Sequence, residues 1–161
     1  ELSDAAYDTV RGTTDSEHLF ALALDRLRAT HTTDAPATAD TLADALVFAV
    51  SRALALAHES GVNEPSYINA ALSNGRAAAA CRFTTDAPSE ADSLYIHTGR
   101  RYVCENGVCR MLDPESGANT AIISSEPLSE DAGWTPIPVN HIALINEDRT
   151  TNVRPWPAAT A

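Results

Sequence analysis

Residues 66–84 read Ser-Tyr-Ile-Asn-Ala-Ala-Leu-Ser-Asn-Gly-Arg-Ala-Ala-Ala-Ala-Cys-Arg-Phe-Thr. Two extended runs flank Asn74-Gly75, a dipeptide that favours a type I′ hairpin turn because both of its residues tolerate positive φ. The stretch therefore predicts strands at 66–73 and 76–84 that pair antiparallel. A second Asn-Gly, at 106–107, predicts another hairpin between short strands at 100–105 and 108–112.

Two helices are predicted before the first hairpin. Thr14 and Glu17 form a capping box, in which the Thr14 hydroxyl accepts from the Glu17 amide and the Glu17 carboxylate reaches back. Apolar residues then recur at three- and four-residue spacing, which predicts a helix that fades near Thr30. A second, more apolar helix is predicted at 38–59, with Gly61 as its stop.

Short strands continue after the hairpins. They are predicted at 93–97, 120–125, 140–146 and 151–154, with a polar loop at 113–119 and an irregular crossing at 127–138 around Trp134. Helices first and about eight strands after them indicate an α+β domain with a mainly antiparallel sheet. Two helices are too few to cover two sheets, so a sheet face or edge is left open. We therefore expect that the chain is not a self-sufficient folding unit.

Composition excludes several classes of partner. The 161 residues carry a formal net charge of −11, from 22 Asp and Glu against 11 Lys and Arg. This excess argues against a nucleic-acid or membrane-surface partner, because both are anionic. All 11 basic residues are Arg, so no Lys can form a Schiff base or clamp a phosphate.

The sequence contains no uncharged apolar run of about 18 residues, so no membrane span is predicted. The acidic N-terminus does not resemble a signal peptide. We expect a cytoplasmic protein, unless a leader has been removed.

Motifs for metals and cofactors are absent from the sequence. The five His are scattered, with no pair at i,i+4 spacing, and the seven Gly form no phosphate loop, so neither a metal nor a cofactor is expected. Three Cys are too few for a disulfide scaffold. With Asn106-Gly107 as a two-residue turn, Cys104 and Cys109 fall opposite one another, close enough for a disulfide where the compartment allows it.

The turn at 12–17, Gly-Thr-Thr-Asp-Ser-Glu, supports two interpretations. As a capped helix start, it places Asp15 and Glu17 where the helix dipole favours each by about 0.3–1 kcal/mol. As a binding site, it presents the Asp15 carboxylate from a Gly-containing turn, where an ammonium group could bind. The residues alone leave both open. The tripeptide Ser124-Ser125-Glu126 is predicted to end a strand. Such a position can be purely structural, or it can place residues at an active site.

Residues 12–22, Gly-Thr-Thr-Asp-Ser-Glu-His-Leu-Phe-Ala-Leu, resemble the signature of class II glutamine amidotransferases. The segment is most similar to the subgroup of glutathione-degrading enzymes and ergothioneine-pathway amidohydrolases. Further matching segments follow in order at 81–83, 93–95, 123–128, 133–134 and 137–141. The resemblance covers nearly the whole chain.

The resemblance implies an N-terminal-nucleophile hydrolase fold, an α/β/β/α sandwich. In that family a Cys at the mature N-terminus attacks the side-chain amide of glutamine. Residue 1 here is Glu, and the three Cys lie within the sequence, so no catalytic residue is carried over and the chain alone is expected to be inactive. Residues 1–161 resemble the C-terminal portion of a single amidotransferase domain, with the nucleophile on a companion polypeptide.

The resemblance also assigns candidate site residues. Asp15 matches the family residue that holds the α-amino group of glutamine. The substrate-binding candidates are Asp15, Thr14 and Ser16, and the candidates for pocket support are Glu17, Ser125 and Glu126. The leading hypothesis is part of an amidohydrolase that cleaves the γ-amide of glutamine or of a γ-glutamyl compound. The alternative is a non-catalytic remnant that binds a γ-glutamyl ligand or a protein.

Overall fold

The computed structural model describes residues 2–99, 101–112, 120–130 and 132–158. Its helices are α1 (Asp4–Tyr7), α2 (Asp15–Thr30) and α3 (Ala39–Glu59), with a 3-10 turn, η1 (Pro88–Glu90). Its strands are β1 (Tyr67–Ser73), β2 (Ala78–Thr84), β3 (Tyr95–Gly99), β4 (Arg101–Glu105), β5 (Val108–Leu112), β6 (Thr120–Ser124), β7 (Trp134–Pro136), β8 (His141–Ile145) and β9 (Thr151–Pro155). The α+β class is confirmed. Strand β7 lies in the predicted irregular crossing, and the predicted loop at 113–119 lies outside the described residues.

Both long helices begin at a threonine. Thr14 caps α2 and Thr38 caps α3, and each hydroxyl accepts from the amide three residues on, at 3.3 and 3.2 Å. Helix α3 stops at Gly61, which has a φ of 81°. There the Val62 amide donates to the Ala57 carbonyl at 2.9 Å, the six-to-one bond of a Schellman cap. The predicted helix at 38–59 and its glycine stop are confirmed.

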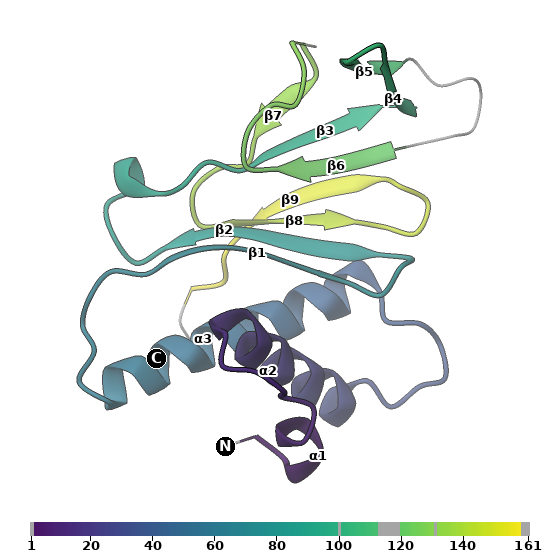
Figure 1. Cartoon of the computed structure of the whole chain (residues 1–161). Coiled ribbons are helices and arrows are strands. Elements are labelled where there is room, and N and C mark those ends of the chain that lie inside the picture. Colours follow the sequence, from purple (N-terminus) through teal and green to yellow (C-terminus); the bar gives the residue numbers. More distant parts are fainter. Residues whose placement is uncertain (1, 100, 113–119, 131, 159–161) are drawn as a thin grey trace.

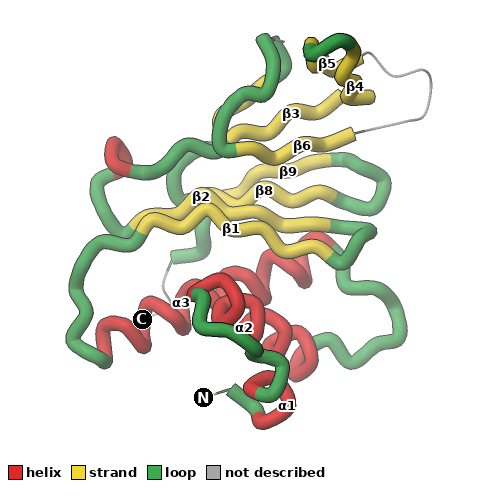
Figure 2. The backbone as a smooth tube through the Cα atoms, viewed as in Figure 1, coloured by secondary structure: helices red, strands yellow, loops and turns green. Residues whose placement is uncertain are grey.

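The sheets and helices stack in layers (Figures 1 and 2). One sheet has the strand order β1-β2-β8-β9, the second has the order β6-β3-β7, and β4 and β5 form a separate hairpin. Helices α2 and α3 lie along one face of the four-stranded sheet, and the three-stranded sheet lies on its other side (Figure 1). Within the described residues, no α-helix covers the far face of the three-stranded sheet, which agrees with the open face expected from the sequence.

Two hydrophobic cores hold the layers together. Between the helices and the four-stranded sheet, small residues such as Ala43, Ala49 and Ala79 are fully buried. Their size lets α3 lie close to the strands. The core between the two sheets is smaller. Its buried members are Leu94, Ile96, Ile137 and Ala143.

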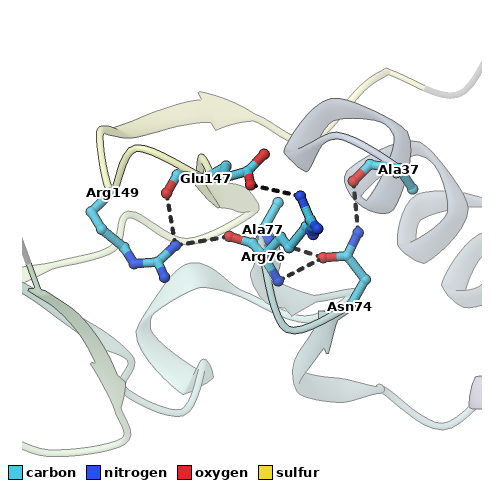
Figure 3. A network of polar contacts seen from close by, with 6 residues as sticks. All are labelled: Ala37, Asn74, Arg76, Ala77, Glu147 and Arg149. Carbon is cyan, nitrogen blue, oxygen red and sulfur yellow. Dashed lines mark hydrogen bonds and ion pairs between the residues drawn. The ribbon is translucent and has the colours of Figure 1, made fainter. Parts of the chain in front are cut away.

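The two Asn-Gly turns differ. Asn106 and Gly107 both have positive φ, at 52° and 81°, as a type I′ turn requires. At the first pair only Gly75 has a positive φ, so the prediction of a type I′ turn there is wrong. The Asn74 side chain explains the difference: its Oδ1 accepts from the amides of Arg76 and Ala77 at 3.0 and 2.9 Å, which widens the turn and delays β2 to Ala78 (Figure 3).

Helix α3 is long and apolar enough to cross a membrane, by length and composition alone. The helix contains Asp40, Asp44 and Arg52, so it is not an uncharged apolar run of the kind whose absence the sequence analysis noted. The core helix of a globular domain meets the same criteria of length and composition. Here Leu42, Leu46 and Val50 of α3 are buried in the core against α2 and the four-stranded sheet.

Candidate functional site

The first turn of α2 is braced by Glu17. Its carboxylate accepts hydrogen bonds from the amides of Arg11 and Gly12, the latter at 2.8 Å, and so fixes the chain that enters the helix. The sequence predicted a reciprocal bond back to the cap. The carboxylate instead reaches past Thr14, because the preceding Gly-containing segment folds over the helix end. Thr14 serves as the cap itself, and its carbonyl oxygen also lies 2.9 Å from Nδ1 of His18.

Asp15 is positioned differently from Glu17. It occupies the first position of α2, and no residue of the described chain donates a hydrogen bond to its carboxylate. It lines a cavity of about 640 Å³, together with Ser16 and His18. A negative charge at a helix N-terminus interacts favourably with the helix dipole. Asp15 therefore places a carboxylate at the cavity that accepts no hydrogen bond from the described residues. Glu17 instead holds the start of the helix in place.

The cavity lies between α2, the C-terminal half of α3 and the first half of β1. Its walls are largely apolar, and Asp15 is the one carboxylate among the described residues that line it. The apolar wall residues include Leu19 and Leu22 from α2, Leu54 and Leu56 from α3, and Ile68 from β1. A charged group facing apolar walls suits a ligand with one cationic end.

Tyr67 forms the rim of the cavity on β1. Its hydroxyl donates a hydrogen bond to the carboxylate of Asp86, which follows the end of β2. This bond raises the pKa of Tyr67 and lowers the pKa of Asp86, since it stabilises the neutral phenol and the ionised carboxylate together. The pair holds the rim in one arrangement.

Asn69 links the cavity to the second sheet. Its side-chain Nδ2 donates to the Ser93 carbonyl at 2.9 Å, and the Ser93 hydroxyl donates to the Ser125 carbonyl at 2.7 Å. Asn69 itself lines the cavity. The segment with Ser125 and Glu126 therefore lies at the same end of the layered structure as Asp15, although neither residue lines the cavity.

Ser125 and Glu126 do not lie on a strand, which corrects the prediction of a strand at 120–125. Strand β6 ends at Ser124, because its partner β3 begins at Tyr95, the residue opposite Ser124. Both residues are exposed in the loop that follows.

None of the three cysteines is an accessible thiol. Cys81 is fully buried in the helix–sheet core, and burial raises its pKa to about 11. Cys104 and Cys109 lie opposite one another on β4 and β5 and form a disulfide, which confirms the predicted register. The described residues hold no cluster of three or more potential metal ligands.

Sequence reasoning missed Tyr67, Asn69 and His18 as site residues. Periodicity identified β1 as a strand, but no local pattern shows which helix end lies beside it. The one available signal is the Asn side chain at 69, a polar residue between the apolar Ile68 and Ala70.

Comparisons with known proteins point to one class. The chain is 30% identical over 157 residues to a probable glutamine amidotransferase, DUG3, of Saccharomyces cerevisiae; the match covers 91% of this chain and 44% of that protein. Its fold matches that of a glutamine aminotransferase class-II domain protein from Silicibacter pomeroyi, with a TM-score of 0.66, 26% identity, and coverage of 98% of this chain and 58% of that one. A predicted glutamine amidotransferase from Pseudomonas aeruginosa shares the fold, with a TM-score of 0.53, 19% identity, and coverage of 88% and 50%. No family model matches.

The chain is thus similar in sequence to a probable glutamine amidotransferase and has the fold of a glutamine aminotransferase class-II domain protein. It spans about half the length of the relatives it matches.

Proposed function

We propose that this chain forms the substrate-binding part of a class II glutamine amidotransferase-like amidohydrolase, which hydrolyses the γ-amide of glutamine or of a γ-glutamyl compound. The observation that carries the proposal is the unengaged Asp15 carboxylate at the start of α2, facing a cavity of about 640 Å³. Such a carboxylate binds the α-ammonium group that every γ-glutamyl compound carries. Similarity to a probable glutamine amidotransferase supports this substrate class.

The nucleophile is proposed to be an N-terminal Cys from sequence outside these 161 residues. The buried Cys81 offers no thiolate, and neither Cys104 nor Cys109 lines the cavity beside Asp15. In the proposed reaction the external thiolate attacks the amide carbon, and the nitrogen leaves as ammonia from glutamine or as an amine from a γ-glutamyl compound, protonated by the α-amino group that took the thiol proton. Water then hydrolyses the thioester and releases glutamate. Asp15 holds the substrate throughout and takes no proton.

The remaining site residues are proposed to act around Asp15. Ser16 contributes a hydroxyl at the cavity wall, and Thr14 and Glu17 hold the turn in shape. Ser125 is tied to the same end of the structure through the link from Asn69, and Glu126 is its neighbour in the loop. The reaction is proposed to take place in the cytoplasm, where thiol nucleophiles stay reduced.

The test compares Asp15→Asn with the parent enzyme, assembled with the part of the domain that carries the Cys. The substrates are glutamine and a γ-glutamyl peptide. If the charge pair is desolvated, kcat/KM should fall by roughly 30-fold to several thousand-fold, equivalent to about 2–5 kcal/mol. Asp40→Asn is the control for loss of a carboxylate from the first turn of a long helix, because Asp40 lies away from this cavity. Its ion-pair partner Arg154, at 3.6 Å, keeps a shorter pair with Asp44 at 2.9 Å.

A change of less than about threefold on both substrates would reduce Asp15 to a helix-cap residue. Binding of the γ-glutamyl peptide without turnover, even with the Cys-bearing part present, would favour the non-catalytic alternative.

A further inference from the structure

A second cavity, of about 270 Å³, lies at the other end of β1 from the Asp15 cavity. Tyr67 at the start of β1 lines the Asp15 cavity, whereas Ser73 at the end of β1 lines the second one. Because a strand rises about 3.3 Å per residue, the length of β1 places these two residues about 20 Å apart. The second cavity is therefore separate from the candidate site.

Two arginines line this second cavity, and no carboxylate does so among the described residues. Arg76 follows the Asn74-Gly75 turn, and Arg149 lies in the turn between β8 and β9. The chain as a whole has twice as many acidic as basic residues, so two arginines beside one cavity reverse the overall charge locally. A cavity with this lining attracts an anion.

The Arg149 guanidinium is held in place without an ion pair. Its Nη1 donates to the carbonyl oxygens of Arg76 and Glu147, each at 2.9 Å (Figure 3). In the described part of the chain no carboxylate pairs with Arg149. Two neutral acceptors therefore orient a positive charge that is left available to a ligand.

The two carboxylates next to Arg149 in the sequence are engaged elsewhere. Glu147 pairs with Arg76 at 3.0 Å, and Oδ1 of Asp148 accepts from the amide and the hydroxyl of Thr150 at 2.9 and 2.6 Å. Neither carboxylate lines the cavity. Glu147 partly neutralises Arg76, so Arg149 is the principal charge that faces a ligand.

The backbone of Arg149 is also unusual. Its φ is 68°, a conformation that residues with a side chain rarely adopt. The turn fixes this φ, because the Arg149 amide donates to the Asn146 carbonyl and the Asn146 amide donates to the Thr150 carbonyl, both at 2.9 Å. Residues held in such conformations cluster at ligand-binding sites.

We propose that this cavity binds a small organic anion through a phosphate or carboxylate group, with Arg149 as its main contact. A guanidinium can donate two parallel hydrogen bonds to the oxygens of either group. Ala121 and Ile145 give the cavity an apolar wall for a short carbon chain. The volume is just below the range of about 300–1,000 Å³ that is usual for drug-sized ligands, which suits a small anion. This site goes beyond the proposed function and does not depend on it.

The test is isothermal titration calorimetry on the full native gene product at about 0.1 M ionic strength. The probes are inorganic phosphate, glycerol phosphate as a phosphate monoester, and malonate as a dicarboxylate. At least one of them should bind with a Kd of about 1 mM or tighter. The tightest of the three identifies the acidic group that the site prefers.

Variants of Arg149 test the assigned contact. Arg149→Asn removes the guanidinium but keeps a residue that tolerates positive φ, so it should weaken binding by roughly 10-fold or more. Arg52→Gln is the matched control, because it removes one positive charge from α3 away from this cavity; it should change the Kd by less than about threefold. Glu147→Gln leaves Arg76 without its ion pair and should bind at least as tightly as the parent.

Urea denaturation without ligand shows whether each variant is folded. If Arg149→Asn does not fold, Arg149→Lys takes its place: it keeps the charge but not the paired donors, and it should still lose more affinity than Arg52→Gln.

Three results would overturn the proposal. They are no saturable binding of any probe, equal losses in the Arg149 variant and Arg52→Gln, and displacement of the anion by a γ-glutamyl peptide, which would place it in the Asp15 cavity. Calorimetry does not measure hydrolysis, so anion binding in a protein without amidohydrolase activity would count against the proposed function alone.

Discussion

The amide of Gly12 donates to Oε2 of Glu17 at 2.8 Å, across the start of α2. The same carboxylate accepts from the amide of Arg11, so one side chain satisfies two backbone donors. Asp15, two residues before Glu17, has no donor among the described residues. Two carboxylates on one helical turn thus have different roles. Glu17 fixes the backbone before the helix, and the Asp15 carboxylate is available to a ligand.

Substitution of Glu17 should therefore affect stability more than substitution of Asp15. Glu17→Ala loses two hydrogen bonds to a charged acceptor at a helix start and should lower the free energy of unfolding by about 1–2 kcal/mol. Asp15→Asn should cost at most about 1 kcal/mol. Urea denaturation of both variants measures the difference. Equal losses would show that Asp15 also holds the turn.

A close contact between Gly133 and His97 gives a second prediction. The His97 ring is buried and packs edge-on against Trp134, with ring centroids 5.0 Å apart. A Cβ added at Gly133 would lie 2.4 Å from Cε1 of that ring. Gly133→Ala should therefore destabilise the protein by about 1–3 kcal/mol through overpacking.

A double-mutant cycle separates this clash from a backbone effect. With His97→Ala present, Gly133→Ala should lose most of its cost, giving a coupling of about 1 kcal/mol or more. Gly75→Ala is the control, because a Cβ there meets nothing within 4 Å and its cost would come from the positive φ of 84°. That cost should add to the effect of His97→Ala without coupling. A cycle at Gly133 that is also additive would place the two residues out of contact.

A comparison of the two Asn-Gly turns shows how much of the turn geometry can be predicted from local sequence. At Asn106-Gly107 the type I′ geometry and the Cys104–Cys109 register follow from the dipeptide. At Asn74 the side-chain amide also donates to the Ala37 carbonyl at 2.7 Å (Figure 3). That contact joins residues 37 positions apart, and it accompanies the different turn. No local pattern could reveal it.

In the candidate site, too, some features can be predicted from local sequence, whereas others depend on contacts between distant segments. The position of Asp15 and the capping role of Thr14 were predictable, because both depend on residues within one helical turn. Tyr67 and Asn69 enter the site through the packing of α2 beside β1, and that packing brings together segments about 50 residues apart. Short-range periodicity predicts each helix and strand, but it does not predict which helix end lies beside which strand.

Cys81 gives a pH-dependent prediction. Burial raises the pKa of this thiol to about 11 from an ordinary value of 9.0. The folded protein therefore retains a proton that the unfolded chain loses, and the associated stability, fully present below pH 9, falls as the pH rises toward 11. By pH 10.5 the parent protein should have lost about 2 kcal/mol relative to Cys81→Ala. Denaturation curves of both proteins from pH 8 to 10.5 measure the change, and parallel pH dependences would contradict the assigned pKa.

The last prediction concerns the Cys104–Cys109 disulfide. The two residues pair across β4 and β5 with Cα atoms 4.0 Å apart, so they remain neighbours whether oxidised or reduced. With the hairpin oxidised, as in the structure, Cys81 is the one free thiol, and it should react with an alkylating reagent only after unfolding, because it is fully buried. Mass spectrometry of protein trapped with alkylating reagent directly from cells, under denaturing and non-reducing conditions, counts the thiols.

The two possible counts lead to different conclusions. One alkylated cysteine means that the hairpin is oxidised where the protein works, and this count would contradict the proposed cytoplasmic location, since a reducing compartment keeps such pairs as thiols. Three alkylated cysteines fit the cytoplasm, and mild oxidation of the purified protein should then lower the count to one, through Cys104–Cys109 alone. The variant Cys104→Ser is the control, because it should keep two reactive thiols after the same oxidation. A disulfide from Cys81 to either hairpin cysteine would contradict both the β4–β5 register and the burial of Cys81 in the helix–sheet core.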